Sequence, residues 1–267
     1  MYISRIKLFN WKNFHDCEVV LSERCFIVGA NATGKSNFLD VIRFMRDIVK
    51  QGGGLQAAVA LRGGLKKIRC LSARQKTDVC IDVDICENGQ SSPKWRYSLE
   101  LSNKGGGIQK PYPLVNREIA YNYYTKETVL DRKYNSKGED SETLKFTHLE
   151  QPTANAEFRE IKDVFQTTEY LNVIPQFVRD ADSVMLSSGM EDYFGRNFME
   201  RLSLLNTATR NKYLKIINEV LLTAVPQLEN LSFVKDEKGV PHIEAKYNHW
   251  RAKGSKQNEK MFSDGTI

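Results

Sequence analysis

The pattern Gly-x-x-x-x-Gly-Lys-Ser at positions 29–36 constrains the fold more than any other feature of the sequence. Its residues are Gly29, Ala30, Asn31, Ala32, Thr33, Gly34, Lys35 and Ser36. The glycines let the backbone curl, so that several N–H groups can point at one anion. In such a loop the lysine, here Lys35, reaches the β- and γ-phosphate oxygens of a nucleotide, and the hydroxyl of Ser36 is a ligand for Mg²⁺. The pattern therefore predicts a phosphate-binding loop for a nucleotide and Mg²⁺.

The residues on both sides of the pattern are those that such a loop requires. Upstream, the apolar run Cys25–Val28 predicts a short strand. Downstream, apolar residues recur at helical spacing as far as Lys50, and three glycines follow at 52–54. A strand, a glycine loop and a helix N-terminus form the geometry that favours phosphate. An ordinary glycine turn before a surface helix is the alternative, and it does not require this order of flanking elements.

Composition indicates a packed protein. The chain has 267 residues, of which 41% are hydrophobic and 27% charged, so wholesale disorder is not expected. Its formal charge is +6, from 39 basic and 33 acidic residues, which permits a nucleic-acid partner without requiring one. The start of the chain has spread charges rather than a signal peptide, and no apolar run approaches membrane-spanning length. We therefore expect a cytoplasmic protein with reduced cysteines and no membrane partner.

Hydrophobic periodicity divides the chain into four expected segments. Residues 1–60 hold an antiparallel strand pair, the loop and the first helix. Residues 61–150 alternate apolar and polar positions between turn signals and predict an antiparallel β-subdomain. Residues 151–228 change to helical spacing and predict a helical insertion whose apolar faces contact a core. Residues 229–267 return to strand pattern.

Three stretches carry a resemblance to a known family. The opening Leu8–Phe14 reads Leu-Phe-Asn-Trp-Lys-Asn-Phe, the loop has Asn31 inside it and Asn37 directly after it, and the tail 262–266 reads Phe-Ser-Asp-Gly-Thr. With these motifs the chain resembles the ABC-type ATPase heads of the RecF–SMC–OLD group. Within that group it looks most like the predicted AAA-family ATPases of bacterial defence and repair systems. The resemblance implies an α/β P-loop NTPase fold, an ABC-ATPase-like head.

The resemblance also implies ligands and partners. ATP and Mg²⁺ would be bound by the loop and Asn37. Lys12, which stands where the group often has arginine, would contact the nucleotide from the first turn. The signature-like residues Ser263, Asp264 and Gly265 would face the γ-phosphate held by another subunit. ATP would then be sandwiched in a homodimer or larger assembly that acts in DNA repair or anti-phage defence, with a partner effector protein.

The end of the chain departs from the group's pattern. In the group, the helix after the signature, the acidic strand that orients Mg²⁺ and water, and a switch histidine follow later, whereas this chain stops at Ile267. We therefore expect the C-terminal part of the head to be missing and the chain alone to hydrolyse ATP very slowly or not at all. Substitute carboxylates are not evident. Asp82 and Asp84 alternate with apolar residues and are predicted to face solvent, and the pair 191–192 has no informative spacing.

Two basic stretches suggest a third ligand. The first contains Arg62, Lys66, Lys67, Arg69, Arg74 and Lys76 without an acid among them. The second contains Lys246, Arg251, Lys253, Lys256 and Lys260 around His249 and Trp250. Either could follow the phosphate backbone of DNA, and either could be an ordinary solvated face.

Two other functions compete with an ATPase head. The chain could be a non-catalytic, truncated module that holds nucleotide or pairs with a complete subunit. It could also be a different P-loop enzyme, such as a GTPase or a small-molecule kinase. The last reading is weakened because no Asn-Lys-x-Asp base-recognition motif occurs and because strands precede the loop.

Overall fold

The computed structural model describes residues 1–73, 77–106, 109–136, 140–179, 192–248, 255–264 and 266. The chain splits into two compact units, Met1–Thr168 and Glu169–Ile267, called the first and second unit below. The four segments expected at 1–60, 61–150, 151–228 and 229–267 do not coincide with these two units.

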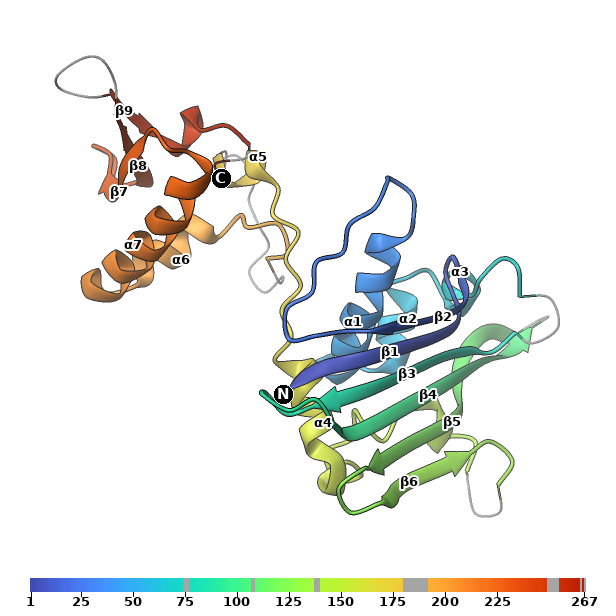
Figure 1. Ribbon diagram of the computed structural model, residues 1–267. Coiled ribbons are helices and arrows are strands. Elements are labelled where there is room, and N and C mark those ends of the chain that lie inside the picture. The colour runs from blue at the N-terminus through green and yellow to red at the C-terminus, as the bar shows by residue number, and fades with distance from the viewer. Residues whose placement is uncertain are drawn as a thin grey trace. The chain divides into compact units, whose positions relative to one another are not determined.

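The first unit is built on one six-stranded antiparallel sheet with the order β2-β1-β3-β4-β5-β6 (Figure 1). Its strands are β1 (Tyr2–Trp11), β2 (Phe14–Val20), β3 (Val79–Cys86), β4 (Pro93–Gly106), β5 (Gln109–Asn122) and β6 (Glu127–Lys133). The strand pair predicted before the loop is confirmed, with Ile6 opposite Val19. Because β1 also pairs with β3, these strands and those of the expected β-subdomain belong to the same sheet.

Helices cover one face of this sheet. They are α1 (Lys35–Val49), α2 (Leu55–Ala60), α3 (Leu65–Ile68) and α4 (Arg159–Gln166), with short 3₁₀ turns η1 (Thr143–Lys145) and η2 (Ala156–Phe158). Phe44 of α1, Val59 of α2 and Phe165 of α4 pack in one core cluster with the inward residues of the strands. The predicted first helix is therefore confirmed, and α4, which lies in the segment 151–228 predicted to be helical, has a buried apolar face.

The strand predicted at Cys25–Val28 is wrong for this structure. These residues form neither strand nor helix. Phe26 is 91% exposed and Val28 is 89% exposed. A strand requires hydrogen-bonded neighbours, and no strand among the described residues pairs with this run. The loop after β2 therefore reaches α1 as an extended, solvated segment.

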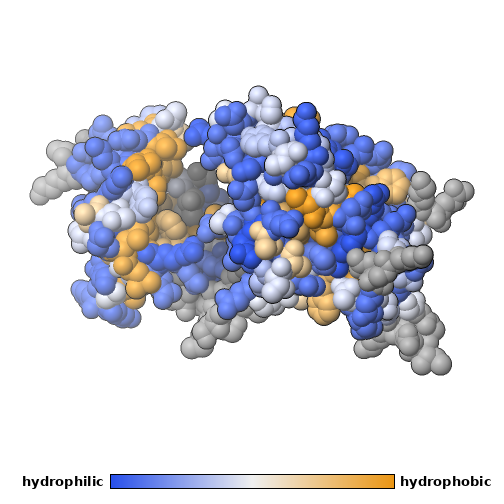
Figure 2. All heavy atoms as spheres, turned by 90° about the horizontal axis from the view of Figure 1, so that it is seen from below, coloured by the Kyte–Doolittle hydropathy of each residue, from blue (hydrophilic) through white to orange (hydrophobic). Residues whose placement is uncertain are grey.

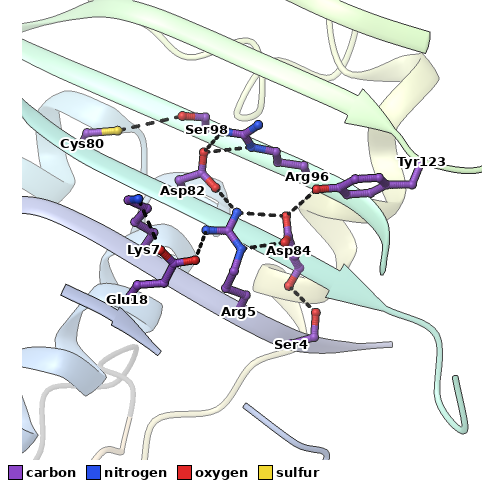
Figure 3. A network of polar contacts seen from close by, with 10 residues as sticks. All are labelled: Ser4, Arg5, Lys7, Glu18, Cys80, Asp82, Asp84, Arg96, Ser98 and Tyr123. Carbon is purple, nitrogen blue, oxygen red and sulfur yellow. Dashed lines mark hydrogen bonds and ion pairs between the residues drawn. The ribbon is translucent and has the colours of Figure 1, made fainter. Parts of the chain in front are cut away.

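The expectation that Asp82 and Asp84 face solvent is also wrong. Both point away from the apolar core, as strand alternation requires, yet they are only 5% and 7% exposed. Figure 3 shows the reason: longer side chains from neighbouring strands close over them. Arg5 Nε donates to Asp84 Oδ2 at 2.7 Å, and Arg5 also pairs with Asp82. Arg96 Nη2 donates to Asp82 Oδ2 at 2.6 Å, so both carboxylates are neutralised where they are buried.

The second unit has its own small sheet. Its helices are α5 (Pro175–Arg179), α6 (Phe198–Leu204) and α7 (Thr207–Ala224), and its strands are β7 (Leu228–Lys235), β8 (Pro241–Tyr247) and β9 (Ser255–Asn258), followed by the 3₁₀ turn η4 (Glu259–Met261). The strands pair in the order β7-β8-β9 and do not join the first sheet.

The helix α7 is only partly the core helix that its sequence predicted. Leu214 is buried in the core of the second unit, but Tyr213, Ile216 and Val220 are exposed. Apolar residues accordingly reach the surface of the second unit, on the left in Figure 2. Among the described residues, no helix is both long enough and apolar enough to cross a bilayer.

Candidate nucleotide-binding site

The glycine that precedes α1 fixes the shape of the loop. Gly34 is the N-cap of α1 and has φ 103°, a left-handed conformation that side chains disfavour. A Cβ atom on Gly34 would lie 2.4 Å from Asn13 Nδ2, so the position also has no room for a side chain. Ala32, two residues earlier, is left-handed as well, with φ 64°. The loop is therefore held in a curled conformation at its junction with the helix.

The lysine of the motif folds back over the loop. Lys35 Nζ donates to the carbonyl oxygens of Gly29 and Ala30, at 2.7 Å each. Thr33 Oγ1 donates to the Ala30 carbonyl at 2.9 Å, which closes the loop from the other side. The ammonium group is therefore held against the loop by two carbonyl oxygens.

The start of α1 offers donors to an anion. The helix has no acidic residue in its first turn and no side-chain cap at its N-terminus in the described structure. The first N–H groups of a helix have no partner within the helix, and the helix dipole makes this end favourable for negative charge. Ser36 is exposed in this first turn. These features fit a phosphate chain, with the Ser36 hydroxyl as the candidate Mg²⁺ ligand. No group of three or more metal-ligating side chains occurs in the part of the chain that the structure describes.

The first turn of the chain packs directly on the loop. Asn37 Nδ2 donates to Asn13 Oδ1 at 2.8 Å, and Trp11 Nε1 donates to the Asn37 carbonyl at 2.8 Å. Trp11 is fully buried against Phe44 of α1, with ring centroids 5.2 Å apart. The structure therefore brings the predicted residue Lys12, which lies between Trp11 and Asn13, next to the predicted loop.

Lys12 is engaged by a carboxylate on α1. Its Nζ lies 2.6 Å from Asp40 Oδ2, and its backbone has φ 49°. Arg62 binds the same carboxylate in a fork, from Nε to Oδ2 at 2.9 Å and from Nη2 to Oδ1 at 2.8 Å. Burial raises the pKa of Asp40, but hydrogen bonds from Arg62 and Lys12 outweigh burial and bring the pKa below its ordinary value. Asp40 therefore stays ionised between two cations.

A basic groove continues from this point. It has a volume of about 830 Å³. Its lining includes Lys12, Asn13, Asn37, Arg62, Lys66, Lys67 and Arg69. Four members of the first predicted basic stretch are thus brought together with two candidate nucleotide contacts. Arg74 and Lys76 lie outside the described residues.

Two lysines of the second predicted basic stretch are paired with glutamates. Lys246 Nζ lies 2.8 Å from Glu229 Oε1, and Lys256 Nζ lies 2.7 Å from Glu244 Oε1. His249, Trp250, Arg251 and Lys253 lie outside the described residues. The charges of Lys246 and Lys256 are therefore balanced, whereas Lys260 is exposed.

The signature-like tail is anchored within the second unit. Arg179 Nη1 lies 2.6 Å from Asp264 Oδ1, and Arg179 Nη2 donates to the Phe262 carbonyl at 2.5 Å. Ser263 Oγ is 2.8 Å from Thr266 Oγ1, so its hydroxyl is used within a turn. Gly265 lies outside the described residues. The turn is exposed at Ser263 and Asp264, which leaves it open to another molecule.

Sequence reasoning missed three residues of this site. Asp40 belongs to the helical pattern of α1, which does not reveal its partners, and Asn13 enters the sequence argument only as part of the motif Leu8–Phe14. Arg62 belongs to a basic run in the sequence, but in the structure it is a buried partner of Asp40 and Asp47. An Asp five residues after the motif lysine, next to the apolar positions of α1, is the signal that could have indicated a buried partner for a cation.

Comparison with known families gives the class of the protein. Residues 25–175 match the family described as "AAA domain, putative AbiEii toxin, Type IV TA system". Residues 3–45 match the family described as "P-loop containing region of AAA domain". The first match covers more than half of the chain, and the chain therefore belongs to this family of AAA domains. The P-loop NTPase fold that the family resemblance implied is confirmed.

One solved structure illustrates a more distant likeness. The chain is similar to the "Crystal structure of the SmcHead bound to the C-winged helix domain of ScpA", with 14% sequence identity and a TM-score of 0.45. The similarity covers 98% of this chain and 72% of that one. A search of curated proteins finds no match.

Proposed function

We propose that this protein binds ATP with Mg²⁺ at the loop Gly29–Asn37 and acts as an ATPase head. The observation that carries the proposal is the placement of Lys35 Nζ over the loop, 2.7 Å from two of its carbonyl oxygens. Family membership supports nucleotide binding as a class property. When ATP binds, Lys35 supplies positive charge, the loop N–H groups supply dipoles and Ser36 supplies an oxygen for Mg²⁺.

Nucleotide binding is tested by titrating the purified chain with ATP and Mg²⁺ in a calorimeter. Lys35→Ala is expected to weaken binding by at least tenfold, because it removes the charge nearest to the phosphates. Lys133→Ala is the matched control, since Lys133 is an exposed lysine on β6 of the same unit. Equal affinity in wild type and Lys35→Ala would contradict the proposal.

The second part of the proposal is pairing of heads around ATP. The loop of one copy would bind the nucleotide, and the turn at Ser263 and Asp264 of a second copy would cover it. The exposure of this turn supports the idea. Light scattering should then show a mass increase with ATP, and Ser263→Arg should remove that increase. Ser136→Arg introduces the same side chain at an exposed site on the first unit and should leave it intact.

Hydrolysis is the third part. We propose that the 267-residue chain turns over ATP very slowly by itself. Phosphate release measured with the purified chain tests this, and turnover at ordinary ATPase rates of about 1 s⁻¹ or more would refute it. A non-catalytic module that only holds nucleotide is the alternative, and it predicts binding without any turnover.

The cellular role that we propose is anti-phage defence, with DNA repair as the competing role, in the cytoplasm and together with an effector protein. The family's description as a putative toxin of a toxin–antitoxin system supports defence over repair. Phage plating on cells that express the protein, with and without Lys35→Ala, tests this role. Protection that survives Lys35→Ala would separate defence from nucleotide binding.

DNA is a second candidate ligand, favoured by the groove that contains Lys66, Lys67 and Arg69. Binding through these cations would weaken steeply with added salt, because each phosphate contact releases counterions. Lys66→Glu with Lys67→Glu should reduce binding to a labelled duplex, whereas Lys133→Glu should not. A flat salt response would remove DNA from the proposal.

A further inference from the structure

The carboxylate of Asp40 binds two cations that differ in their freedom. Arg62 uses Nε and Nη2 on Asp40, and its Nη1 donates to Asp47 Oδ2 at 3.0 Å and to the Ala58 carbonyl at 2.9 Å. Its guanidinium carbon also lies 5.0 Å from the centre of the Phe44 ring. Arg62 is therefore held through Nε, Nη1 and Nη2, and it acts as a rigid support for the Asp40 carboxylate.

Lys12, by contrast, retains donors. An ammonium group has three N–H donors, and the contact with Asp40 uses one of them. The Lys12 side chain is one quarter exposed and lines the basic groove. Its backbone adopts a left-handed conformation that costs roughly as much as a weak hydrogen bond for a residue other than glycine, and such strain is common at functional positions. Lys12 can thus bind Asp40 and a ligand in the groove at once.

The groove begins at the first turn of α1, beside the loop. The loop and Lys35 would take the terminal phosphates, so the phosphate next to the sugar, with the nucleoside, has to leave the loop along the first turn of α1. Asn37 belongs to that turn and lines the groove together with Lys12. Asn13 connects the two, because it bonds Asn37 and packs against Gly34.

We propose that Asp40, braced by Arg62, is a positioning residue that aims the Lys12 ammonium at the sugar-linked phosphate of the nucleotide. Asp40 touches no ligand itself. This inference rests on the proposed ATP binding and assigns different parts of ATP to different residues. The loop binds the terminal phosphates, whereas the Asp40–Lys12 pair binds the sugar-linked phosphate.

The test compares two ligands that share the terminal phosphates. ATP and inorganic tripolyphosphate are each titrated, with Mg²⁺, into the full chain and into Asp40→Asn. Asp40→Asn should weaken the affinity for ATP by about tenfold, which is the effect expected when a charge-assisted contact is misdirected. The same variant should change the affinity for tripolyphosphate by less than about twofold. A merely structural role of Asp40 would weaken both ligands together.

Three further variants make the test specific. Lys12→Gln should reproduce the loss for ATP, and the double variant with Asp40→Asn should lose no more than Lys12→Gln alone, because Asp40 acts through Lys12. Lys12→Gln leaves Asp40 paired with Arg62, so it keeps the test usable if Asp40→Asn folds poorly. Asp131→Asn breaks a similar fork, with Arg117, away from the groove and should change neither affinity.

Each other result overturns the inference. Equal losses for ATP and tripolyphosphate would place the effect in the loop or the fold. If Asp40→Asn bound ATP with unchanged affinity, or if the losses of ATP affinity added up in the double variant, Asp40 would not act through Lys12. If wild-type protein binds neither ligand, the proposed function fails and this inference fails with it, a result distinct from any loss specific to Asp40→Asn.

Discussion

Gly34 lies so close to Asn13 that a single methyl group would force the two apart. A Cβ atom built on Gly34 comes within 2.4 Å of Asn13 Nδ2 and 2.9 Å of Phe14 Cζ. The turn after β1 therefore packs directly against the phosphate-binding loop. The conformation of the loop depends on this contact between segments about 20 residues apart in sequence.

Gly34→Ala should consequently damage both stability and nucleotide binding. The left-handed φ and the clash together are expected to cost about 1–3 kcal/mol of unfolding free energy, and ATP affinity should fall by at least about tenfold. Urea unfolding and calorimetry measure the two effects. Gly52→Ala is the control, since Gly52 has φ 70° but nothing within 4 Å of its Cβ position. A Gly34→Ala protein no less stable than Gly52→Ala would contradict the close packing.

The core of the first unit depends on one buried carboxylate. Glu118 is fully buried on β5 and accepts four hydrogen bonds, from Tyr97 Oη at 2.7 Å, Arg132 Nε at 2.9 Å, His148 N at 2.9 Å and Leu149 N at 3.1 Å. The contacts tie β4, β5 and β6 to the segment before α4. Burial, and then the charge of Glu118, raise the pKa of Tyr97 well above its ordinary value, so its hydroxyl remains a donor.

Glu118→Gln should therefore be strongly destabilising. The amide cannot accept four bonds and leaves the buried Arg132 without its counter-charge, which is expected to cost about 3–5 kcal/mol. Chemical denaturation measures the change. Glu142→Gln removes an exposed carboxylate paired with Lys145 and should cost less than about 1 kcal/mol. Similar stability of the two variants would show that the Glu118 network is not formed.

The sequence predicted the loop and α1 because their pattern is local. A glycine before a helix and an apolar stripe at helical spacing describe the residues themselves, and the alternation in β3 to β6 does so too. The buried position of Asp82 could not be read in this way, because it depends on Arg5 and Arg96, which come from other strands. Asp40 escaped notice for the same reason: its partners Lys12 and Arg62 are distant in sequence.

The failed strand prediction at Cys25–Val28 has a different cause. A continuous apolar run is typical of a strand buried on both faces of a sheet, and such a run forms only where neighbouring strands receive it. The local pattern indicates that the segment is able to form a strand. Whether it forms one depends on whether neighbouring strands pair with it.

That distinction gives a third prediction. Because Phe26 is 91% exposed, Phe26→Ser should change the unfolding free energy of the 267-residue chain by no more than about 0.5 kcal/mol. Phe38→Ala, a truncation of a core side chain on α1, should cost about 3–5 kcal/mol. Thermal or urea unfolding measures the free energy of unfolding of both variants. A Phe26→Ser protein as unstable as Phe38→Ala would mean that the segment is packed after all.

The ion pairs of Asp40 predict a pH dependence with a defined sign. The pKa of Asp40 is lower in the folded chain than in the unfolded chain, so its contribution to stability is complete above the ordinary carboxyl pKa of about 3.9 and is lost as pH falls through the folded value. The difference in unfolding free energy between wild type and Asp40→Asn should therefore be constant near neutral pH and shrink as pH falls below about 4.

The dependence on salt distinguishes the stabilisation by the buried Asp40 ion pairs from that by the exposed pair Asp131–Arg117. A hydrogen bond from Arg117 lowers the pKa of Asp131, and the opposing effect of burial is smaller. The stability that Asp131→Asn removes therefore depends on pH with the same sign as the stability that Asp40→Asn removes. Both members of that pair are more than 40% exposed, whereas the Asp40 and Arg62 side chains are 13% and 8% exposed. Since salt screens exposed charges more than buried ones, adding about 0.5 M NaCl should largely remove the Asp131 effect and preserve most of the Asp40 effect. Equal screening of the two would contradict the buried position of Asp40 between Lys12 and Arg62, on which its proposed role depends.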